Sequence, residues 1–324
     1  MNNVIGIDLG GTKVTGAIFD KNGIIVKKSS SLLEKREGKE VGKLILDLID
    51  ELLNYLGGTS GIVSAVGVCV PGIADVKTGM VWAPNIPGWE DYPLQREIET
   101  HLKKQNTRVY IASDRTCYIL GERWNGQAKD CDNAVFIAVG TGIGLGILVD
   151  GRIIHGHGDI IGATGWMALQ TPYEEEYQKY GCFETYASGE GIARQAKKIL
   201  KSNAPLYKDS MLGRKGVDNI TSHDVFFAYS QNDPLAVFVL NKAIEFWGMA
   251  AANIVSLLNP EKIIWGGGVF GPAQQFIDMI YDEASRWAQP IAIKQVTFEN
   301  SLLAGEAGLY GAGFLALKSF TNEL

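Results

Sequence analysis

The stretch Asp8-Leu9-Gly10-Gly11-Thr12-Lys13 decides the architecture at the start of the chain. It follows a short apolar run rich in β-branched residues at positions 4–7, and residues 14–19 have the composition of a second strand. This order predicts a β-hairpin with Gly10-Gly11-Thr12 at its tip. We expect the two glycines to adopt positive φ and let the backbone approach a ligand, with N–H groups and the Thr12 hydroxyl pointing at phosphate oxygens. An ordinary tight turn is the alternative that this stretch leaves open.

Asp8 ends the first predicted strand, where its carboxylate can lie near a magnesium ion carried by a bound phosphate. The surrounding residues fit neither G-x-G-x-x-G nor G-x-x-x-x-G-K-[ST]. The hairpin therefore predicts neither a Rossmann fingerprint nor a Walker loop, and the rest of the chain has to separate a phosphate site from an ordinary turn.

A second stretch has the same order of predicted elements as the first, a strand, a glycine- and threonine-rich turn and another strand. Residues 133–139 predict a strand, Gly140-Thr141-Gly142 a tight turn and residues 144–149 another strand. The repetition predicts two similar folded halves, each with a phosphate-contacting hairpin. Two such turns favour the phosphate interpretation over two chance turns.

Asp114 follows a predicted strand at residues 109–112. Between the hairpins, residues 41–56 have the apolar spacing of an amphipathic helix. Residues 62–70 predict a buried strand, and residues 109–112 predict another strand. This order predicts an α/β layer with a mixed sheet and a crossover helix. Open α/β sheets place active sites at the carboxyl ends of their strands, so Asp114 is a candidate catalytic carboxylate. The alternative is a helix N-cap before residue 116.

The composition excludes several classes of partner. The chain has 324 residues, 46% hydrophobic and 20% charged, and a formal net charge of −6. These values suit a globular protein of two domains and argue against nucleic acid or an anionic membrane as the main partner. The four cysteines form no C-x-x-C pair, no signal peptide is visible, and no apolar run reaches the ~18 residues of a membrane span. We therefore expect a cytoplasmic protein.

Taken in order, the motifs of the chain resemble sugar kinases of the ROK family, within the actin/hexokinase/Hsp70 ATPase superfamily. The resemblance extends almost from end to end. It is carried by Asp8-Leu9-Gly10-Gly11-Thr12-Lys13, Gly67-Val68-Cys69-Val70-Pro71-Gly72, Ala83-Pro84-Asn85, Gly88-Trp89, Pro93-Leu94, Ser113-Asp114, Gly140-Thr141-Gly142-Ile143-Gly144, Gly181-Cys182-Phe183-Glu184, Ala187-Ser188-Gly189 and Gly266-Gly267-Gly268.

The resemblance implies an α/β fold of two ribonuclease H-like, actin-like ATPase domains, with mixed five-stranded sheets and a cleft between them. We expect a smaller N-terminal domain at residues 1–115, joined by a C-terminal helix at about residues 304–324, and a larger domain at residues 116–303. The resemblance also implies a homodimer. Because the two phosphate turns lie on opposite halves, we expect the domains to close over the substrates.

The resemblance implies roles for individual residues. Asp114 is the implied catalytic base, and Asp8 is associated with the Mg²⁺ of ATP. ATP contacts are implied for Gly10, Gly11, Thr12, Lys13, Thr141, Gly142, Gly266, Gly267 and Gly268. Sugar contacts are implied for Gly72, Asn85, Asp114 and Glu184. From the residues alone, Asn85 is equally a turn residue after Pro84, and Glu184 is alternatively a solvated loop carboxylate.

The chain departs from the family pattern at Gly162-Ala163-Thr164-Gly165-Trp166. Ala163 stands where the family has a sugar-binding Glu, and Trp166 where it has a His that ligates zinc and touches the sugar. Of the family's zinc ligands only Cys182 remains, so we expect no structural zinc. Trp166 offers an apolar face on which a sugar ring can stack, and Asp159 can replace the lost carboxylate.

These inferences predict an ATP-dependent kinase that phosphorylates a hexose or amino sugar such as glucose, at the 6-hydroxyl, with Asp114 as general base. The alternative is a sugar-sensing binding protein without catalysis, because the departures fall in the sugar site. A DNA-binding repressor is disfavoured by the negative charge and by a core strand that begins at Val4.

Overall fold

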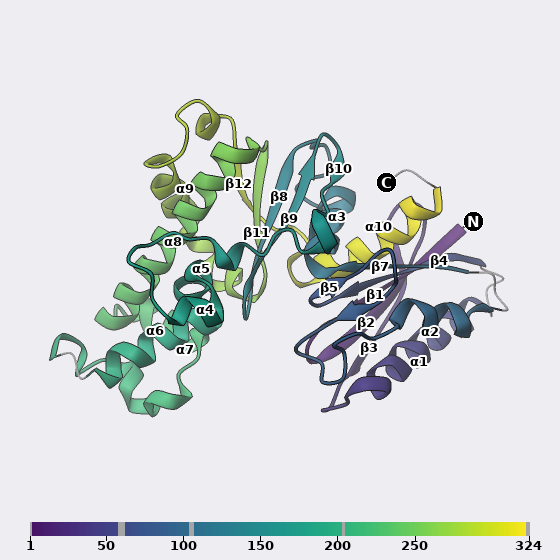
Figure 1. The fold of residues 1–324 in the computed structure, drawn as a ribbon, viewed down its shortest axis with the longest axis horizontal. Coiled ribbons are helices and arrows are strands. Elements are labelled where there is room, and N and C mark those ends of the chain that lie inside the picture. The colour runs from purple at the N-terminus through teal and green to yellow at the C-terminus, as the bar shows by residue number, and fades with distance from the viewer. Residues whose placement is uncertain (1, 58–61, 104–106, 203–204, 322–324) are drawn as a thin grey trace. The chain divides into compact units, whose positions relative to one another are not determined.

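A computed structural model describes residues 2–57, 62–103, 107–202 and 205–321 (Figure 1). They form two compact units. The first unit contains the residues up to Asp132, Gly146–Ile161 and the residues from Ser301 on, and the second contains Asn133–Leu145 and Gly162–Asn300. Residues 116–132 and 146–161 thus belong to the first unit, whereas the expectation from the sequence places them in the larger C-terminal domain.

The first unit is built around a mixed five-stranded sheet in the order β3-β2-β1-β4-β7. Strands β1, β2 and β3 pair antiparallel, and β1, β4 and β7 pair parallel. The strands are β1 (Asn2–Leu9), β2 (Lys13–Phe19), β3 (Ile25–Leu32), β4 (Ile62–Val70) and β7 (Arg108–Ser113), with a small hairpin of β5 (Ile73–Ala74) and β6 (Val81–Trp82).

Helices cover both faces of this sheet (Figure 1). Successive side chains along β1 point to opposite faces of the sheet. Ile5, Ile7 and Leu9 therefore share one core with α1 (Gly38–Gly57) and α2 (Leu94–His101). The positions between them, such as Val4 and Asp8, face α10 (Ala307–Thr321), which packs beside α3 (Asp114–Asn125). Asp8, the residue expected near Mg²⁺, therefore lies on the face of the sheet that α10 covers.

A second mixed sheet has the order β10-β9-β8-β11-β12. Its strands are β8 (Ala134–Val139), β9 (Ile143–Val149), β10 (Arg152–Ile153), β11 (Lys262–Gly266) and β12 (Thr297–Asn300). The first unit includes β10 and the later part of β9, and the second unit includes the rest. Two mixed five-stranded sheets with helices confirm the predicted α/β class.

The second unit packs its helices around α8 (Pro234–Leu258), which contacts α5, α6, α7 and α9. The others are α4 (Glu176–Tyr180), α5 (Cys182–Ala187), α6 (Gly189–Lys201), α7 (Ser222–Ser230) and α9 (Ile277–Ser285). Helix α8 is long and apolar enough to cross a membrane, but 67% of its most apolar 18-residue stretch is buried inside the protein. Burial of this kind is typical of a core helix.

Candidate functional site

The Gly10-Gly11-Thr12 turn joins β1 to β2, as predicted, with Leu9 opposite Val14. The expectation of positive φ at Gly10 and Gly11 is wrong, since neither lies in the left-handed region. The Gly10 N–H donates to the Lys13 carbonyl at 2.9 Å, a hydrogen bond that closes the turn beyond the last strand pair. Gly11 instead lets the turn lie close to the Asn85 side chain, because an added Cβ would lie 3.3 Å from Nδ2 of Asn85. Gly11, Thr12 and Asn85 are exposed, and Gly11 lies next to Asn85 in the first unit.

Asp8 lies beneath the start of α10. A Cβ placed on Gly308 would lie 2.7 Å from Oδ1 of Asp8, so only glycine lets the helix pass this close. Burial raises the pKa of the Asp8 carboxyl, while a hydrogen bond from the Cys69 thiol and the charge of Lys13 lower it. A carboxylate in this setting can supply oxygen to a hard cation.

Asp114 is the first residue of α3, at the end of β7. The N-cap is Ser113, whose hydroxyl accepts a hydrogen bond from the N–H of Thr116 at 3.4 Å. The capping alternative for Asp114 is therefore wrong. Burial raises the pKa of Asp114 to about 6, with a smaller increase from the charge of Asp8, against lowering by Arg115. The pKa of this carboxyl thus lies closer to neutral pH than that of an ordinary aspartate.

The strand register brings these two carboxylates to the same edge of the sheet. Asp8 is opposite Cys69 on β4, and Cys69 is opposite Ala112 on β7, two residues before Asp114. Because β1, β4 and β7 are parallel, their carboxyl ends meet there. The two carboxylates come together because of the order of the strands in the sheet. The residue pattern of each single strand does not predict that order.

Gly72 lies near this edge, after β4, with φ of +97°. A Cβ added there would lie 2.2 Å from the carbonyl oxygen of Trp82, and the Arg115 guanidinium donates to the Gly72 carbonyl at 3.1 Å. Arg115 follows Asp114 directly, so this hydrogen bond links the loop after β4 to the first turn of α3.

In the second unit, Gly140-Thr141-Gly142 joins β8 to β9, as predicted. The Gly140 N–H donates to the Gly142 carbonyl at 2.9 Å, and the Gly140 carbonyl accepts from Gly189 at 2.8 Å. Thr141 is exposed at the tip. Here too neither glycine has a left-handed φ, so an exposed backbone and hydroxyl are what the turn offers a ligand.

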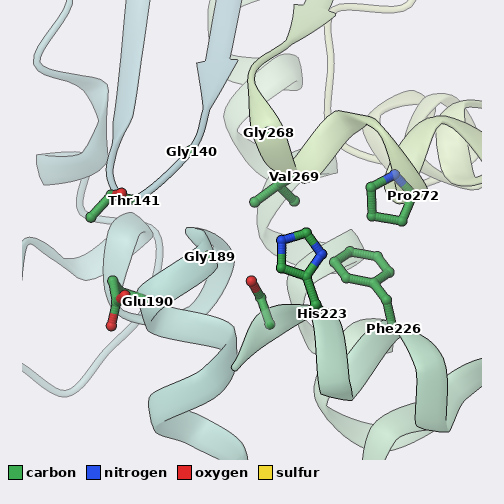
Figure 2. Close-up of a pocket in the computed structure, with 10 residues that line it drawn as sticks. Gly140, Thr141, Gly189, Glu190, His223, Phe226, Gly268, Val269 and Pro272 are labelled. Carbon is green, nitrogen blue, oxygen red and sulfur yellow. The ribbon is translucent and has the colours of Figure 1, made fainter. Parts of the chain in front are cut away.

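A pocket of about 350 Å³ opens beside this turn, entirely within the second unit (Figure 2). Thr141 and Glu190 lie on one side of it, and His223, Phe226 and Pro272 on the other. The predicted residues Gly140, Thr141 and Gly268 line it together with Gly189, Glu190, Ser222, His223, Phe226, Val269 and Pro272.

Sequence reasoning missed the pocket walls formed by α6 and α7. Thr221 and Asp224 form the capping box that starts α7, a pattern visible in the sequence. The capping box predicts where the helix begins. It does not predict that the first turn of the helix lines the same pocket as Gly140 and Gly268.

The structure brings Gly266, Gly267 and Gly268 to the end of β11. Gly266 is buried against Phe136, while Gly267 has φ of +87° and approaches the Val139 carbonyl, 2.4 Å from where a Cβ would lie. Gly268 has open space around its Cα and lines the pocket. Of the three glycines, Gly268 is thus the one that faces a ligand-sized space.

Glu184 lies on α5 and is half-buried, so its interpretation as a solvated loop carboxylate is wrong. Its Oε2 accepts a hydrogen bond from the Ile143 N–H, directly after the Gly140–Gly142 turn, at 2.9 Å. Burial raises the pKa of Glu184, and the Ile143 N–H and the charge of Arg194 lower it.

Trp166 and Ala163 are both exposed, and the Trp166 side chain is 56% accessible. Asp159 belongs to the first unit, where it accepts from the Val76 N–H at 3.4 Å and pairs with His155 at 3.1 Å, whereas Ala163 belongs to the second. That Asp159 replaces the carboxylate of the family's Glu, which is absent at Ala163, stays a prediction.

The segment at which the resemblance would place a zinc loop contains a tyrosine cluster. The Tyr177 and Tyr186 hydroxyls are 2.9 Å apart, Gln170 donates to both, and both donate to Glu174. Within the described ranges no three His, Cys, Asp or Glu side chains gather as metal ligands would. Hydrogen bonds among side chains thus hold this segment to α5.

Comparison with known proteins gives a consistent set of relatives. A family model described as "ROK family" matches residues 4–319. The chain is 32% identical over 319 residues to a "Glucokinase" of Halalkalibacterium halodurans, covering 96% of this chain and 94% of that protein. It is 27% identical over 271 residues to a "Xylose repressor" of Caldicellulosiruptor bescii (82% and 66% covered) and 23% identical over 327 residues to an "N-acetyl-D-glucosamine kinase" of Yersinia pseudotuberculosis (96% and 98%).

Solved structures agree in fold. A ROK hexokinase from Thermus thermophilus superposes with a TM-score of 0.79 at 24% identity, covering 99% of both chains. A ROK glucokinase from Streptomyces griseus, solved with glucose and AMPPNP, superposes with a TM-score of 0.72 at 27% identity, covering 97% of this chain and 99% of that one.

Proposed function

Because the chain belongs to the ROK family, we propose that it is a sugar kinase that transfers the γ-phosphoryl group of ATP to the 6-hydroxyl of a hexose or amino sugar such as glucose. The glucokinase and N-acetyl-D-glucosamine kinase relatives support this substrate class. We further propose a homodimer, on the resemblance alone, and a cytoplasmic location, because the four cysteines are free thiols.

The observation that carries the proposal is the position of Asp114, directly after β7 and at the same edge of the sheet as Asp8. A general base works best when its pKa lies near the operating pH, and burial raises the pKa of Asp114 to about 6. Asp114 would accept the proton of the sugar hydroxyl as that oxygen attacks phosphorus. In the first unit the exposed Gly11 and Thr12 lie at the hairpin tip, and the Lys13 side chain offers a positive charge. These groups would stabilise the negative charge of the phosphoryl group.

Mg²⁺ is the metal that this reaction implies, and Asp8 fits it. Asp8 is half-buried at a strand end, and its carboxylate oxygens are hard donors. The metal would supply charge neutralisation on the phosphates.

The second unit would hold the nucleotide. Its pocket combines a backbone turn with an exposed hydroxyl at Thr141 and apolar surfaces at Val269 and Phe226. The backbone turn and the hydroxyl suit the phosphate groups of a nucleotide, and the apolar surfaces suit its flat base. Contacts to the sugar are proposed for Gly72, Asn85, Trp166 and Glu184, with the Trp166 ring as a stacking face.

The direct test measures ADP release by the purified protein with MgATP against glucose, N-acetylglucosamine, mannose, fructose and a β-glucoside. We expect one sugar to stimulate turnover strongly over the ATPase background. Failure of every sugar to raise turnover above that of an Asp114→Ala variant would contradict the kinase proposal.

The pH profile gives an independent check. A carboxyl with a pKa of about 6 is protonated below that pH and cannot accept the hydroxyl proton. We therefore expect kcat/KM to rise with pH, to reach half its maximum near pH 6, and to be flat above about pH 7. The profile is measured from about pH 5 to about pH 8 at constant ionic strength. A flat profile through pH 6 would exclude Asp114 as the titrating base.

A sugar-sensing protein without catalysis is the second candidate, favoured by the similarity to the xylose repressor. The chain spans 66% of that relative. Calorimetry separates the two candidates, because a sensor binds a sugar tightly without transferring phosphate from ATP to it.

A further inference from the structure

The Glu184 carboxylate lies between two segments of the second unit. A Cβ added to Gly142, in the turn between β8 and β9, would lie 2.8 Å from its Oε2. A Cβ added to Gly165, next to Trp166, would lie 2.5 Å from the same atom. Both segments can reach the carboxylate only because they present glycine to it.

One hydrogen bond connects the carboxylate to the turn. The Ile143 N–H donates to Oε2 at 2.9 Å. Ile143 is buried, so without this acceptor its N–H would lose a partner in a place where water does not readily replace it. A carboxylate has about four lone-pair positions, and the bond to Ile143 leaves capacity for a sugar hydroxyl.

The helix that carries Glu184 is firmly held. The Ser188 hydroxyl donates to the Glu184 carbonyl at 2.9 Å, and the buried Trp247 indole N–H donates to the Ala187 carbonyl at 3.0 Å. Tyr186, on the same helix, belongs to the tyrosine cluster. The carboxylate therefore projects from a fixed base, and a displacement of its tip is transmitted to the turn.

We propose that Glu184 couples sugar binding to nucleotide binding. It fixes the Gly140-Thr141-Gly142 turn through Ile143 and accepts a sugar hydroxyl with the same carboxylate, so that each ligand orders the group that the other needs. This inference rests on the proposed function. Coupling of this kind is reciprocal, so sugar must tighten nucleotide binding by the same factor as nucleotide tightens sugar binding.

The test is calorimetric titration of MgADP into the full-length protein, without sugar and with saturating amounts of the sugar that the turnover panel identifies. Glu184→Gln keeps an oxygen for the Ile143 N–H, so we expect its affinity for MgADP alone to stay within about twofold of wild type. Glu184→Ala removes the acceptor, and we expect MgADP affinity to fall by about tenfold and the effect of sugar on it to disappear. Both variants should bind the sugar more weakly.

A second substitution keeps the carboxylate but displaces it. Gly165→Ala puts a methyl group against Oε2, although Gly165 does not line the nucleotide pocket. We expect it to weaken MgADP binding in the same direction as Glu184→Ala. Gly213→Ala is the matched control, because its added Cβ would only reach ordinary contact with Leu200, at 4.0 Å.

The outcomes distinguish the two proposals. If the wild-type protein binds no MgADP, the proposed function itself fails. If the wild type binds MgADP while Glu184→Ala and Gly165→Ala bind it equally well, the function stands and the coupling by Glu184 is refuted. Circular dichroism of each variant confirms that it is folded before titration.

Discussion

Asp114→Asn is expected to lower kcat by about 10²–10⁴-fold while leaving nucleotide binding unchanged. Asparagine has the size of aspartate, and its carbonyl oxygen can still accept the Arg115 N–H that Oδ1 of Asp114 accepts at 2.8 Å. It cannot take up the proton of a sugar hydroxyl. The pocket proposed for the nucleotide lies wholly in the second unit, and the substitution leaves its lining residues unchanged.

The measurement combines steady-state ADP release with calorimetric titration of MgADP into the same preparation. Asp47→Asn is the control, because Asp47 is an exposed carboxylate paired with Lys43 on α1. We expect this control to keep full activity. A substantial rate in Asp114→Asn, at any sugar concentration, would remove Asp114 from the role of base.

Gly311→Ala is expected to destabilise the first unit strongly. Gly311 lies within α10, where alanine normally favours the helix by about 1 kcal/mol. Here a Cβ would lie 1.8 Å from the Cys117 carbonyl oxygen of α3, which is backbone and cannot rotate away. The two helices must then separate, and we expect the free energy of unfolding to fall by about 3 kcal/mol or more.

Thermal unfolding followed by circular dichroism measures this effect, and a midpoint lowered by several degrees is expected. Gly305→Ala is the matched control just before α10, because its added Cβ would meet nothing within 4 Å. Equal midpoints for the two variants would contradict the packing argument. Since α3 begins at Asp114 and α10 packs on Asp8, loss of this contact should also reduce activity at elevated temperature.

The sequence by itself determined the elements whose signals are local. Alternating apolar residues beside glycine turns predicted both hairpins, because a strand period and a turn need only a few neighbouring residues. The order of motifs indicated the ROK family, and the family model matches residues 4–319.

The tertiary structure decided which groups meet. Whether Ser113 or Asp114 caps α3 depends on side-chain geometry that both residues could satisfy. The hydrogen bond from Ile143 to Glu184 spans 41 positions in the chain, and the pocket walls of α6 and α7 come from separate segments. Such contacts depend on how elements pack, and packing is set by the whole core rather than by neighbouring residues. The hairpin at Asp8–Lys13 could therefore be predicted from its own residues, whereas the placement of Glu184 against the second hairpin required the folded chain.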